Sequence, residues 1–442
     1  MPFRKFFDRS AKPAASAQTD STAPEPEEND EAFDGDPEAA PEESASIDWR
    51  ARATHVLPTG ASTGSKRAAA LYGSDDAIGP THFSGAVGCR VFDVDGNEYV
   101  DCTMALGSVA LGYAEPTVTR AVIDAAGNGN IAGLSDYREV ELAERLCEII
   151  PSAEMVQFLK TGAEATSAAV RLARTYTGRD LVIGCGYFGW HDWSSAANGV
   201  PAATRAAYQT VPFDDIPALE AAVAAAGKQL AAIIIEPVIE RMPQPLWVTK
   251  ARELCDRVGA ALVFDETKTG FRLCTAGYQE YSKITPDLAT FGKAMANGYS
   301  LSAVVGKRAL MEAARATWIS STLASESTAL AAAGAVLDWH EQADICESLA
   351  SIGREQCEAM RAAIKASGVE GVSVDGIDQM WMLRFNSPVR ERRFLEFAAG
   401  HGVLFKRGAY NYPAIAHDED TIRRIEAAAS AAFIELRDEG VS

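Results

Sequence analysis

The sequence lacks the long apolar run of about 18 residues that a membrane-spanning helix requires. Its best candidate, residues 219–237, is interrupted by Lys228 and Gln229. The first ten residues, MPFRKFFDRS, also lack the apolar core of a secretory signal. We therefore expect a cytoplasmic enzyme or binding protein that does not associate with a membrane.

The sequence also lacks any CxxC pair, although it contains eight cysteines. Scattered cysteines argue against a zinc site or a disulfide framework and fit a reducing compartment. We expect them to be buried or half-buried free thiols. They are Cys89, Cys102, Cys147, Cys185, Cys255, Cys274, Cys346 and Cys357.

Basic residues are missing from one stretch, which runs from Asp20 to Asp48 and carries twelve carboxylates. The remainder of the chain accounts for only −8 of the net charge of −20, which gives no indication of nucleic-acid binding. The stretch is rich in Pro, Ala and Ser and cannot bury enough apolar surface to fold. We predict a disordered acidic tail over residues 1–47, either a solubilising extension or a segment that binds a partner.

Short apolar runs alternate with Ala-rich helical segments from about Met155 onwards. A continuous apolar strand is typical of a mostly parallel sheet that helices cover on both faces. The expected strands are MVQFL, LVIGCG, AAIIIEP, ALVFDE, LATFGKA and SAVVG. We further expect a hairpin at Asp95-Gly96, helices over 115–126, 138–150 and 324–341, and a smaller C-terminal domain after 342 that contains QMWMLRF and GVLFKRG.

Three features at the predicted strand ends could carry chemistry. The segment FLKTGAEATSAAVRLARTYTGRD predicts a helix that starts near Gly162 and stops at Gly178, and such a start suits a phosphate or is an ordinary strand–helix turn. Glu236 and Asp265 end apolar strands. They could be helix caps or metal ligands, but no nearby run supplies further acidic ligands, so we do not expect a metal.

Lys293 stands among small and apolar residues twenty-eight positions after Asp265. A lone lysine of this kind is either a surface lysine with a buried stem or an amine nucleophile with lowered proton affinity. The combination with the helix start, the aromatic run GYFGWHDW and the strand-end aspartate favours the nucleophile. Pyridoxal phosphate (PLP) requires this set of groups: a phosphate site, a ring-stacking partner, a carboxylate and a lysine.

With these residues the chain resembles the class III aminotransferases of PLP fold type I, and especially their glutamate-1-semialdehyde aminomutase-like branch. The resemblance runs from about Leu57 to the C-terminus. It implies an α/β fold, in which residues 106–335 form a large PLP-binding domain with a mostly parallel seven-stranded sheet. Residues 48–105 and 336–442 would form a smaller α+β domain. The motifs that carry it are VFDVDGNEYVD, EVELAERL, TGAEATSAAVRLARTYTGR, GYFGWHDW, IIIEPV, VFDETKTGFR, PDLATFGKAMANGYSLSAVVG and SSTLASESTALAAA.

The resemblance assigns roles to individual residues. Lys293 would hold PLP as a Schiff base, and Asp265 would pair with the pyridinium nitrogen. Tyr187 and Thr267 would pack on the two faces of the ring, and Glu236 would lie close to it. As in the family, the protein would be a homodimer with shared active sites.

The phosphate would be held by N–H groups of Gly162 and Ala163 and by Thr322 of the neighbouring subunit.

Some positions depart from the family pattern. The common SGSEA or SGTEA reads TGAEA, so that Ala163 offers no hydroxyl, and Phe188 replaces the histidine of YHG. Thr267 replaces the usual Val or Ile after the Asp-Glu pair. We expect a reshaped cofactor pocket with its essential groups retained.

The implied activity is transfer of an amino group from a small-molecule donor to a carbonyl acceptor. An aminomutase is the first alternative, although AMANGYSLSA departs from the Gly-rich GGGxPxGA-like run of those enzymes. A catalytically silent protein that acts through its acidic tail is the second. Four basic residues could bind a substrate carboxylate: Lys66, Arg67, Arg272 and Arg407.

Overall fold

The protein is described here by a computed structural model, which covers residues 45–440. The predicted acidic tail lies almost wholly outside these residues. Only its last three positions, 45–47, are described, and they belong to the first helix, α1 (Ala45–Val56).

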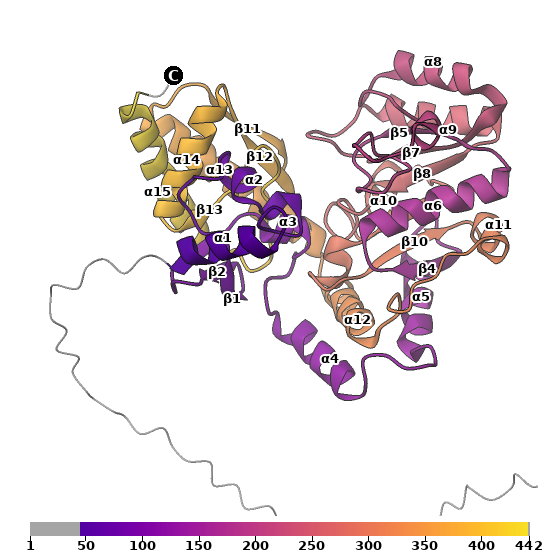
Figure 1. Cartoon of the computed structure of the whole chain (residues 1–442), viewed down its shortest axis with the longest axis horizontal. Coiled ribbons are helices and arrows are strands. Elements are labelled where there is room, and N and C mark those ends of the chain that lie inside the picture. The colour runs from indigo at the N-terminus through magenta and orange to yellow at the C-terminus, as the bar shows by residue number, and fades with distance from the viewer. Residues whose placement is uncertain (1–44, 441–442) are drawn as a thin grey trace, which may run out of the picture. The chain divides into compact units, whose positions relative to one another are not determined.

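The largest element is a seven-stranded sheet with the strand order β4-β10-β9-β8-β7-β5-β6 (Figure 1). Four of its neighbouring pairs are parallel, and β10 runs antiparallel to both of its neighbours. The predicted seven-stranded, mostly parallel sheet is therefore confirmed. Its strands are β4 (Met155–Leu159), β5 (Leu181–Cys185), β6 (Tyr208–Thr210), β7 (Leu230–Ile235), β8 (Ala261–Asp265), β9 (Leu288–Phe291) and β10 (Ser302–Gly306).

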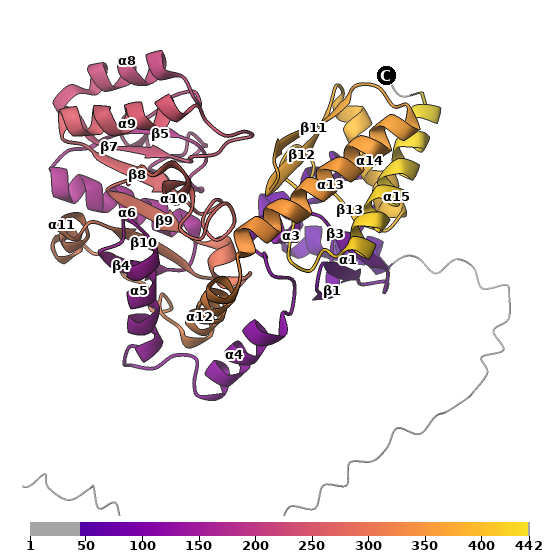
Figure 2. The same ribbon diagram turned by 180° about the vertical axis from the view of Figure 1, so that it is seen from behind.

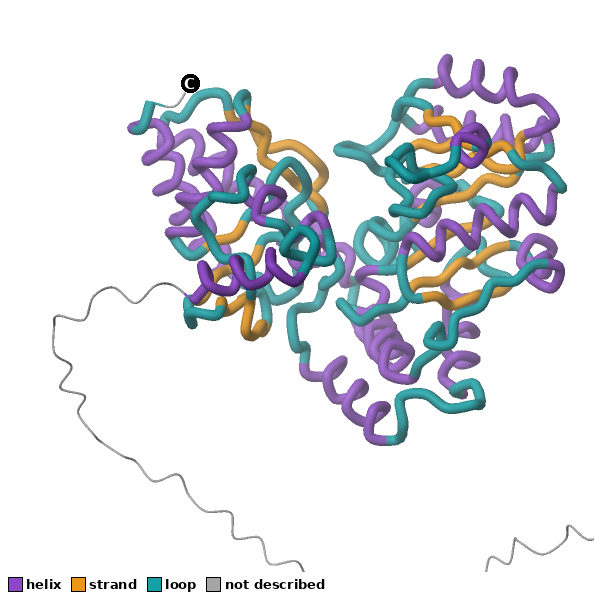
Figure 3. The backbone as a smooth tube through the Cα atoms, viewed as in Figure 1, coloured by secondary structure: helices purple, strands orange, loops and turns teal. Residues whose placement is uncertain are grey.

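Helices cover both faces of this sheet, and β7 shows why its sequence is apolar throughout. Ala232 and Ile234 pack into the apolar cluster that contains helix α6 (Gly162–Thr177). Ile233 and Ile235 pack into the other cluster, with helices α8 (Ile216–Ala226) and α9 (Pro245–Val258). Because neither face meets water, alternation is lost. Figure 3 shows the strands of this sheet running between helices.

Two segments distant in sequence share a four-stranded sheet of order β1-β2-β3-β13. Its members are β1 (Phe83–Val87), β2 (Arg90–Asp93), β3 (Glu98–Asp101) and β13 (Val403–Leu404). Strands β2 and β3 are antiparallel around Asp95-Gly96, so the predicted hairpin is confirmed. Strand β13 pairs in parallel with β3 and thereby joins the C-terminal segment to the N-terminal one.

The C-terminal segment adds a hairpin and three long helices. The hairpin consists of β11 (Val372–Ile377) and β12 (Met380–Phe385). Helices α13 (Ile345–Ser367) and α15 (Glu419–Asp438) lie side by side in both views, next to α14 (Pro388–Gly400) (Figures 1 and 2). Stacked rings of Phe394 and Phe433, with centroids 4.5 Å apart, pack α14 against α15.

The predicted helices over 115–126, 138–150 and 324–341 are confirmed as α4, α5 and α12. The remaining helices are α2 (Ala68–Tyr72), α3 (Met104–Gly107), α4 (Pro116–Gly127), α5 (Tyr137–Ile149), α7 (Ala202–Ala206), α10 (Tyr278–Ser282), α11 (Arg308–Met311) and α12 (Ser327–Gln342), with short 3-10 turns η1 (Gly64–Lys66), η2 (Gly227–Gln229), η3 (Lys293–Ala296) and η4 (Glu312–Ala316). Within residues 45–440, no helix combines the length and apolarity that crossing a membrane requires.

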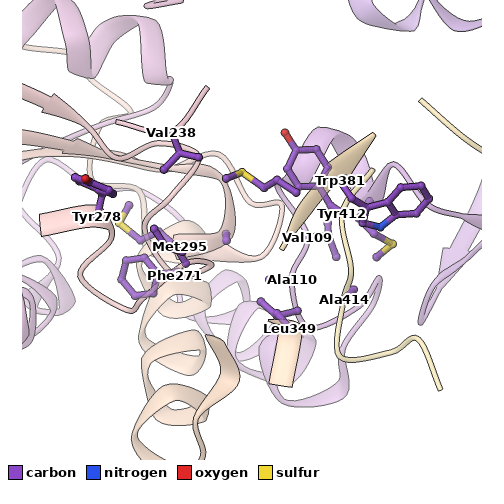
Figure 4. Packing of buried hydrophobic residues seen from close by; sticks show 14 of the residues in the cluster. Val109, Ala110, Val238, Phe271, Tyr278, Met295, Leu349, Trp381, Tyr412 and Ala414 are labelled. Atoms are coloured by element: carbon purple, nitrogen blue, oxygen red, sulfur yellow. The ribbon is translucent and has the colours of Figure 1, made fainter. Parts of the chain in front are cut away.

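One apolar cluster continues from the large sheet into the C-terminal segment. Figure 4 shows part of it, with Phe271, Met295 and Leu349 among the buried side chains. Trp381 is buried in the same cluster, and its indole N–H donates to Gln356 Oε1 at 2.9 Å. This bond satisfies a buried donor that would otherwise be costly.

Gly353 lies where α13 passes the turn between β11 and β12, and a Cβ there would stand 1.8 Å from Asp378 O. We expect Gly353→Ala to lower the apparent thermal midpoint of unfolding, at a cost of about 1–3 kcal/mol, because helix and turn must separate. The matched control is Gly334→Ala in α12, where a Cβ meets no atom within 4 Å. It should be neutral or stabilise by up to about 1 kcal/mol. Equal effects of the two variants in thermal unfolding would contradict this packing.

Candidate active site

Strands β8 and β9 bring two polar side chains together at their carboxyl ends. The parallel register pairs Asp265 with Thr290. The Thr290 hydroxyl donates to Asp265 Oδ1 at 2.8 Å, and Thr267 N–H donates to the same oxygen at 3.1 Å. Within the described residues Oδ2 accepts no hydrogen bond. One carboxylate oxygen is therefore fixed by the protein and the other remains for a ligand.

The Asp265 carboxylate is in a costly environment. Burial raises the pKa of Asp265, and the nearby charge of Glu236 raises it further. The side chains of Thr267 and Thr290 act in the opposite direction and only partly offset the effect of burial on the pKa. A cation placed against Oδ2 would keep this carboxylate ionised.

Lys293 follows β9 and begins the 3-10 turn η3. Its backbone is left-handed, with φ of 47°, which is uncommon for a residue with a side chain. Burial lowers the pKa of Lys293; Asp265 and Glu236 oppose this, while Lys268 and Arg272 add to it. A lysine whose proton affinity is lowered in this way can act as an amine nucleophile near neutral pH.

Helix α6 begins beside this pair. Thr161 and Glu164 form a capping box, which uses the N–H of Glu164. The first N–H groups of a helix have no acceptor within it, so those of Gly162 and Ala163 remain for another acceptor. Gly178 ends the helix in a left-handed conformation, as predicted. The free N–H groups and the positive end of the helix dipole suit an anion such as phosphate.

Thr267 lies between the helix start and the lysine turn. A Cβ on Gly162 would stand 3.2 Å from the Thr267 methyl carbon, and one on Gly292 would stand 3.4 Å from it. The Thr267 hydroxyl is buried and makes no hydrogen bond of regular geometry within the described residues, although it lies close enough to Asp265 to lower the pKa of that carboxyl. Buried hydroxyls are usually paired, so this one marks a place for a polar ligand.

Glu236 follows β7 and connects two further parts of the site. One carboxylate oxygen accepts from Tyr187 N–H at 3.2 Å. The other forms an ion pair with Lys268. The Tyr187 ring is 74% exposed, so the structure leaves it open on the surface of the chain.

Lys268 is the residue that the sequence analysis missed. It is only 8% exposed, and its amine stands 4.3 Å from the centre of the Tyr410 ring. Burial lowers its pKa, but the Glu236 carboxylate together with Tyr410 and Tyr412 more than offsets this, and the pKa of Lys268 is raised. A signal was present in the spacing. Asp265 and Thr290 are register partners, and a lysine follows each of them after three residues: Lys268 after Asp265 and Lys293 after Thr290.

Arg272, a predicted substrate residue, is fully buried. Its guanidinium donates to the backbone oxygens of Pro413 at 2.9 Å, Gly107 at 3.3 Å and Val109 at 3.4 Å, and it lies over the Tyr412 ring. Residues 104–107 form a left-handed turn, a costly conformation that these bonds help to hold. Only Nε remains without a partner among the described residues, so a substrate role for Arg272 stays a prediction.

The other predicted residues lie apart from this group. Lys66 and Arg67 are exposed at the 3-10 turn η1 and the start of α2. Arg407 pairs with Glu391 of α14 at 3.6 Å. Thr322 is exposed in the loop before α12, and its predicted contact is with a second copy of the chain.

The residues around Asp265 and Lys293 fit PLP. The helix start offers N–H groups for a phosphate, Asp265 Oδ2 suits a protonated ring nitrogen, and the Thr267 hydroxyl is orphaned beside them. Lys293 supplies the amine for an aldehyde. Each of the two strand-end carboxylates has its own protein partners: Lys268 for Glu236, and Thr267 and Thr290 for Asp265. Residues 45–440 contain no cluster of His, Cys, Asp and Glu suited to a metal ion.

Known proteins share this architecture. The family model "Aminotransferase class-III" matches residues 74–187 and 191–415. The 3-aminobutyryl-CoA aminotransferase of Cloacimonas acidaminovorans is 34% identical over 365 residues, covering 79% of this chain and 88% of that protein. The glutamate-1-semialdehyde 2,1-aminomutase of Dechloromonas aromatica is also 34% identical, over 396 residues, covering 81% and 92%. A solved structure with PLP, that of the FumI protein of a Sphingopyxis species, has a TM-score of 0.84 at 27% identity and covers 89% of this chain and 97% of that one.

The orphaned hydroxyl of Thr267 gives a test that needs no substrate. We expect Thr267→Val to leave the thermal midpoint of the cofactor-free chain unchanged or raised, because the change removes an unsatisfied buried group. The matched control is Thr269→Val, whose buried hydroxyl donates to Glu266. That change should destabilise by about 1–3 kcal/mol. A Thr267→Val variant as unstable as the control would show that its hydroxyl already has a partner in the protein.

Proposed function

The chain belongs to the class III aminotransferase family and uses PLP as its cofactor, and on that premise we propose that it transfers an amino group from a small-molecule amine to a carbonyl acceptor through Lys293. The observation that carries the proposal is the pairing of Asp265 with Thr290, which places a buried carboxylate beside a lysine of lowered pKa. These are the two groups that the reaction cannot do without.

PLP, when bound, supplies an electron sink for the negative charge that develops on the substrate carbon. Asp265 would hold the proton on the ring nitrogen, because a carboxylate next to that nitrogen favours its charged form. Lys293 would bind the cofactor covalently and, once released by the substrate amine, would carry a proton between the substrate and the cofactor. Its lowered pKa supports this role as a base.

The remaining predicted residues would position the cofactor. Gly162 and Ala163 would donate N–H groups to its phosphate, as the start of α6 allows. Thr267 and Tyr187 would pack on the two faces of the ring. Glu236 would stay near the ring with its charge balanced by Lys268.

We place the protein in the cytoplasm as a homodimer. Thr322 would complete the phosphate site of the partner subunit. Exposed large apolar side chains near the segments of Tyr187 and Thr322 support a subunit contact there, since such patches mark interaction sites. They are Trp190, Trp318 and Leu323.

The eight free cysteines support a reducing compartment. Residues 106–335 would form the cofactor domain, with 48–105 and 336–442 in the smaller one.

Replacement of Lys293 tests the proposal. We expect Lys293→Ala to abolish amino transfer and the visible absorbance of lysine-bound PLP, because the other lysine of the site, Lys268, is held in an ion pair with Glu236. Amine donors and carbonyl acceptors would be screened by absorbance for each half-reaction. The control is Lys228→Ala, at an exposed lysine, which should retain both properties. Near-normal turnover of Lys293→Ala would refute the assignment.

An aminomutase is the second candidate, because relatives of both activities are equally similar to this chain. The run AMANGYSLSA after Lys293, which departs from the aminomutase pattern, favours transfer between molecules. Incubation with glutamate-1-semialdehyde in the absence of any amino donor separates the two. We expect no 5-aminolevulinate to accumulate over many turnovers. Sustained formation of that product would establish the aminomutase.

Substrate choice would depend on the basic residues outside the core of the site. Lys66 and Arg67 are exposed and free to meet a carboxylate, whereas Arg407 is engaged by Glu391. An arginine binds a carboxylate as a fork and a lysine binds it as a point charge. Substituting Arg67 and Lys66 separately, and measuring KM for acidic and neutral donors, would show which one selects the substrate.

A further inference from the structure

Two lysines follow the ends of neighbouring parallel strands. Asp265 of β8 and Thr290 of β9 are register partners, and Lys268 and Lys293 each follow three residues later. Adjacent strands lie about 4.8 Å apart. Thr267 precedes Lys268 and Gly292 precedes Lys293, and a Cβ on Gly292 would stand 3.4 Å from the Thr267 methyl carbon. The second lysine therefore belongs to the same site as the first.

Lys268 is fixed rather than mobile. Its amine is paired with one oxygen of Glu236, lies 3.4 Å from the Tyr410 hydroxyl and stands over the Tyr410 ring. Tyr410 is held in turn by Glu240 N–H, which donates to its hydroxyl at 2.7 Å. A lysine held by a carboxylate and an aromatic face stays charged and in place.

The charges that act on Lys293 come from four side chains. Two are acidic, Asp265 and Glu236, and two are basic, Lys268 and Arg272. The Lys268 amine contacts Glu236 and Tyr410, and Tyr412 also acts on its charge. In low-dielectric surroundings a single unbalanced charge changes the protonation of a neighbour strongly.

We propose that Lys268 is a positioning residue for the Lys293 amine, whose charge cancels that of Glu236 so that the reactive amine stays neutral and free to attack. Glu236 without Lys268 would act on Lys293 as a carboxylate that lacks its cation, and would favour the protonated, unreactive form of the Lys293 amine. Lys268 without Glu236 would have the opposite effect, because a neighbouring cation disfavours a second one. This role deepens the proposed function and rests on Lys293 being the reactive lysine.

The test follows the protonation of Lys293 directly. The full-length chain, freed of cofactor, is labelled at a series of pH values with trace acetic anhydride against an internal amine standard. Acetylation requires the neutral amine, and mass spectrometry of the Lys293 peptide gives the midpoint pH of its reactivity. We expect Lys268→Met to raise that midpoint by about one pH unit and Glu236→Gln to lower it by a similar amount.

The double variant Lys268→Met with Glu236→Gln should return the midpoint to near its original value, which a purely structural role of Lys268 would not do. Lys268→Arg, which keeps the charge, should also leave it near that value. The matched control is Lys250→Met, which removes a lysine from an exposed pair with Glu253 and should not shift it. If Lys268→Met does not fold, the downward shift of Glu236→Gln still tests the proposal.

Unchanged midpoints in both single variants, or shifts in the same direction, would overturn the role of Lys268. The measurement needs no PLP, donor or acceptor, so its outcome is independent of the proposed transfer activity. A chain without that activity can still show opposed shifts, and an active enzyme can fail to show them.

Discussion

The hydrogen bond from Thr290 to Asp265 joins the two central strand ends on which the site depends. It forms because parallel pairing of β8 and β9 places a hydroxyl opposite a carboxylate at the last paired position of the two strands. One oxygen of Asp265 is thereby fixed, and the other points to where a ligand cation would lie. A slip of one residue between the two strands would move Thr290 to the opposite face of the sheet from Asp265 and break this bond. The same pairing therefore determines where Lys293 stands.

Burial sets the chemistry of this site and also its cost. Desolvation raises the pKa of Asp265 and lowers that of Lys293, so each is shifted towards its neutral form. The other buried charges are compensated by specific partners: Lys268 by Glu236 and an aromatic ring, and Arg272 by backbone oxygens. Buried pairs of this kind add little net stability. Their effect is to fix the charges around the one amine that can react.

Much of this arrangement could be predicted from the sequence, because local pattern determines it. Continuous apolar runs indicated the strands, Gly162 and Gly178 bounded the helix, and polar residues just after the runs located the site. Short edge strands such as β1 and β6 were not predicted, since three to five residues without a clear alternation of apolar and polar side chains carry little signal.

The partners of individual charged residues could not be predicted from local sequence. Lys268 lay within a recognised motif, but its pairing with Glu236 joins two different strand ends and its contact with Tyr410 comes from the C-terminal segment. Arg272 was one of four predicted candidates for a carboxylate ligand, and its bonds to backbone oxygens far away in sequence carried no local signal. Tertiary packing decides such choices. The contact proposed for Thr322 is with a second copy of the chain, so the structure of a single chain does not contain it.

The central claim is that Lys293, and not its neighbour Lys268, forms the covalent bond to PLP. Reduction of the PLP-loaded protein with borohydride, followed by peptide mapping in a mass spectrometer, tests it most directly because reduction makes the bond permanent. The account predicts a single pyridoxyl group on the peptide that contains Lys293. A pyridoxyl group on Lys268, or no modified lysine in a protein that binds PLP, would contradict it.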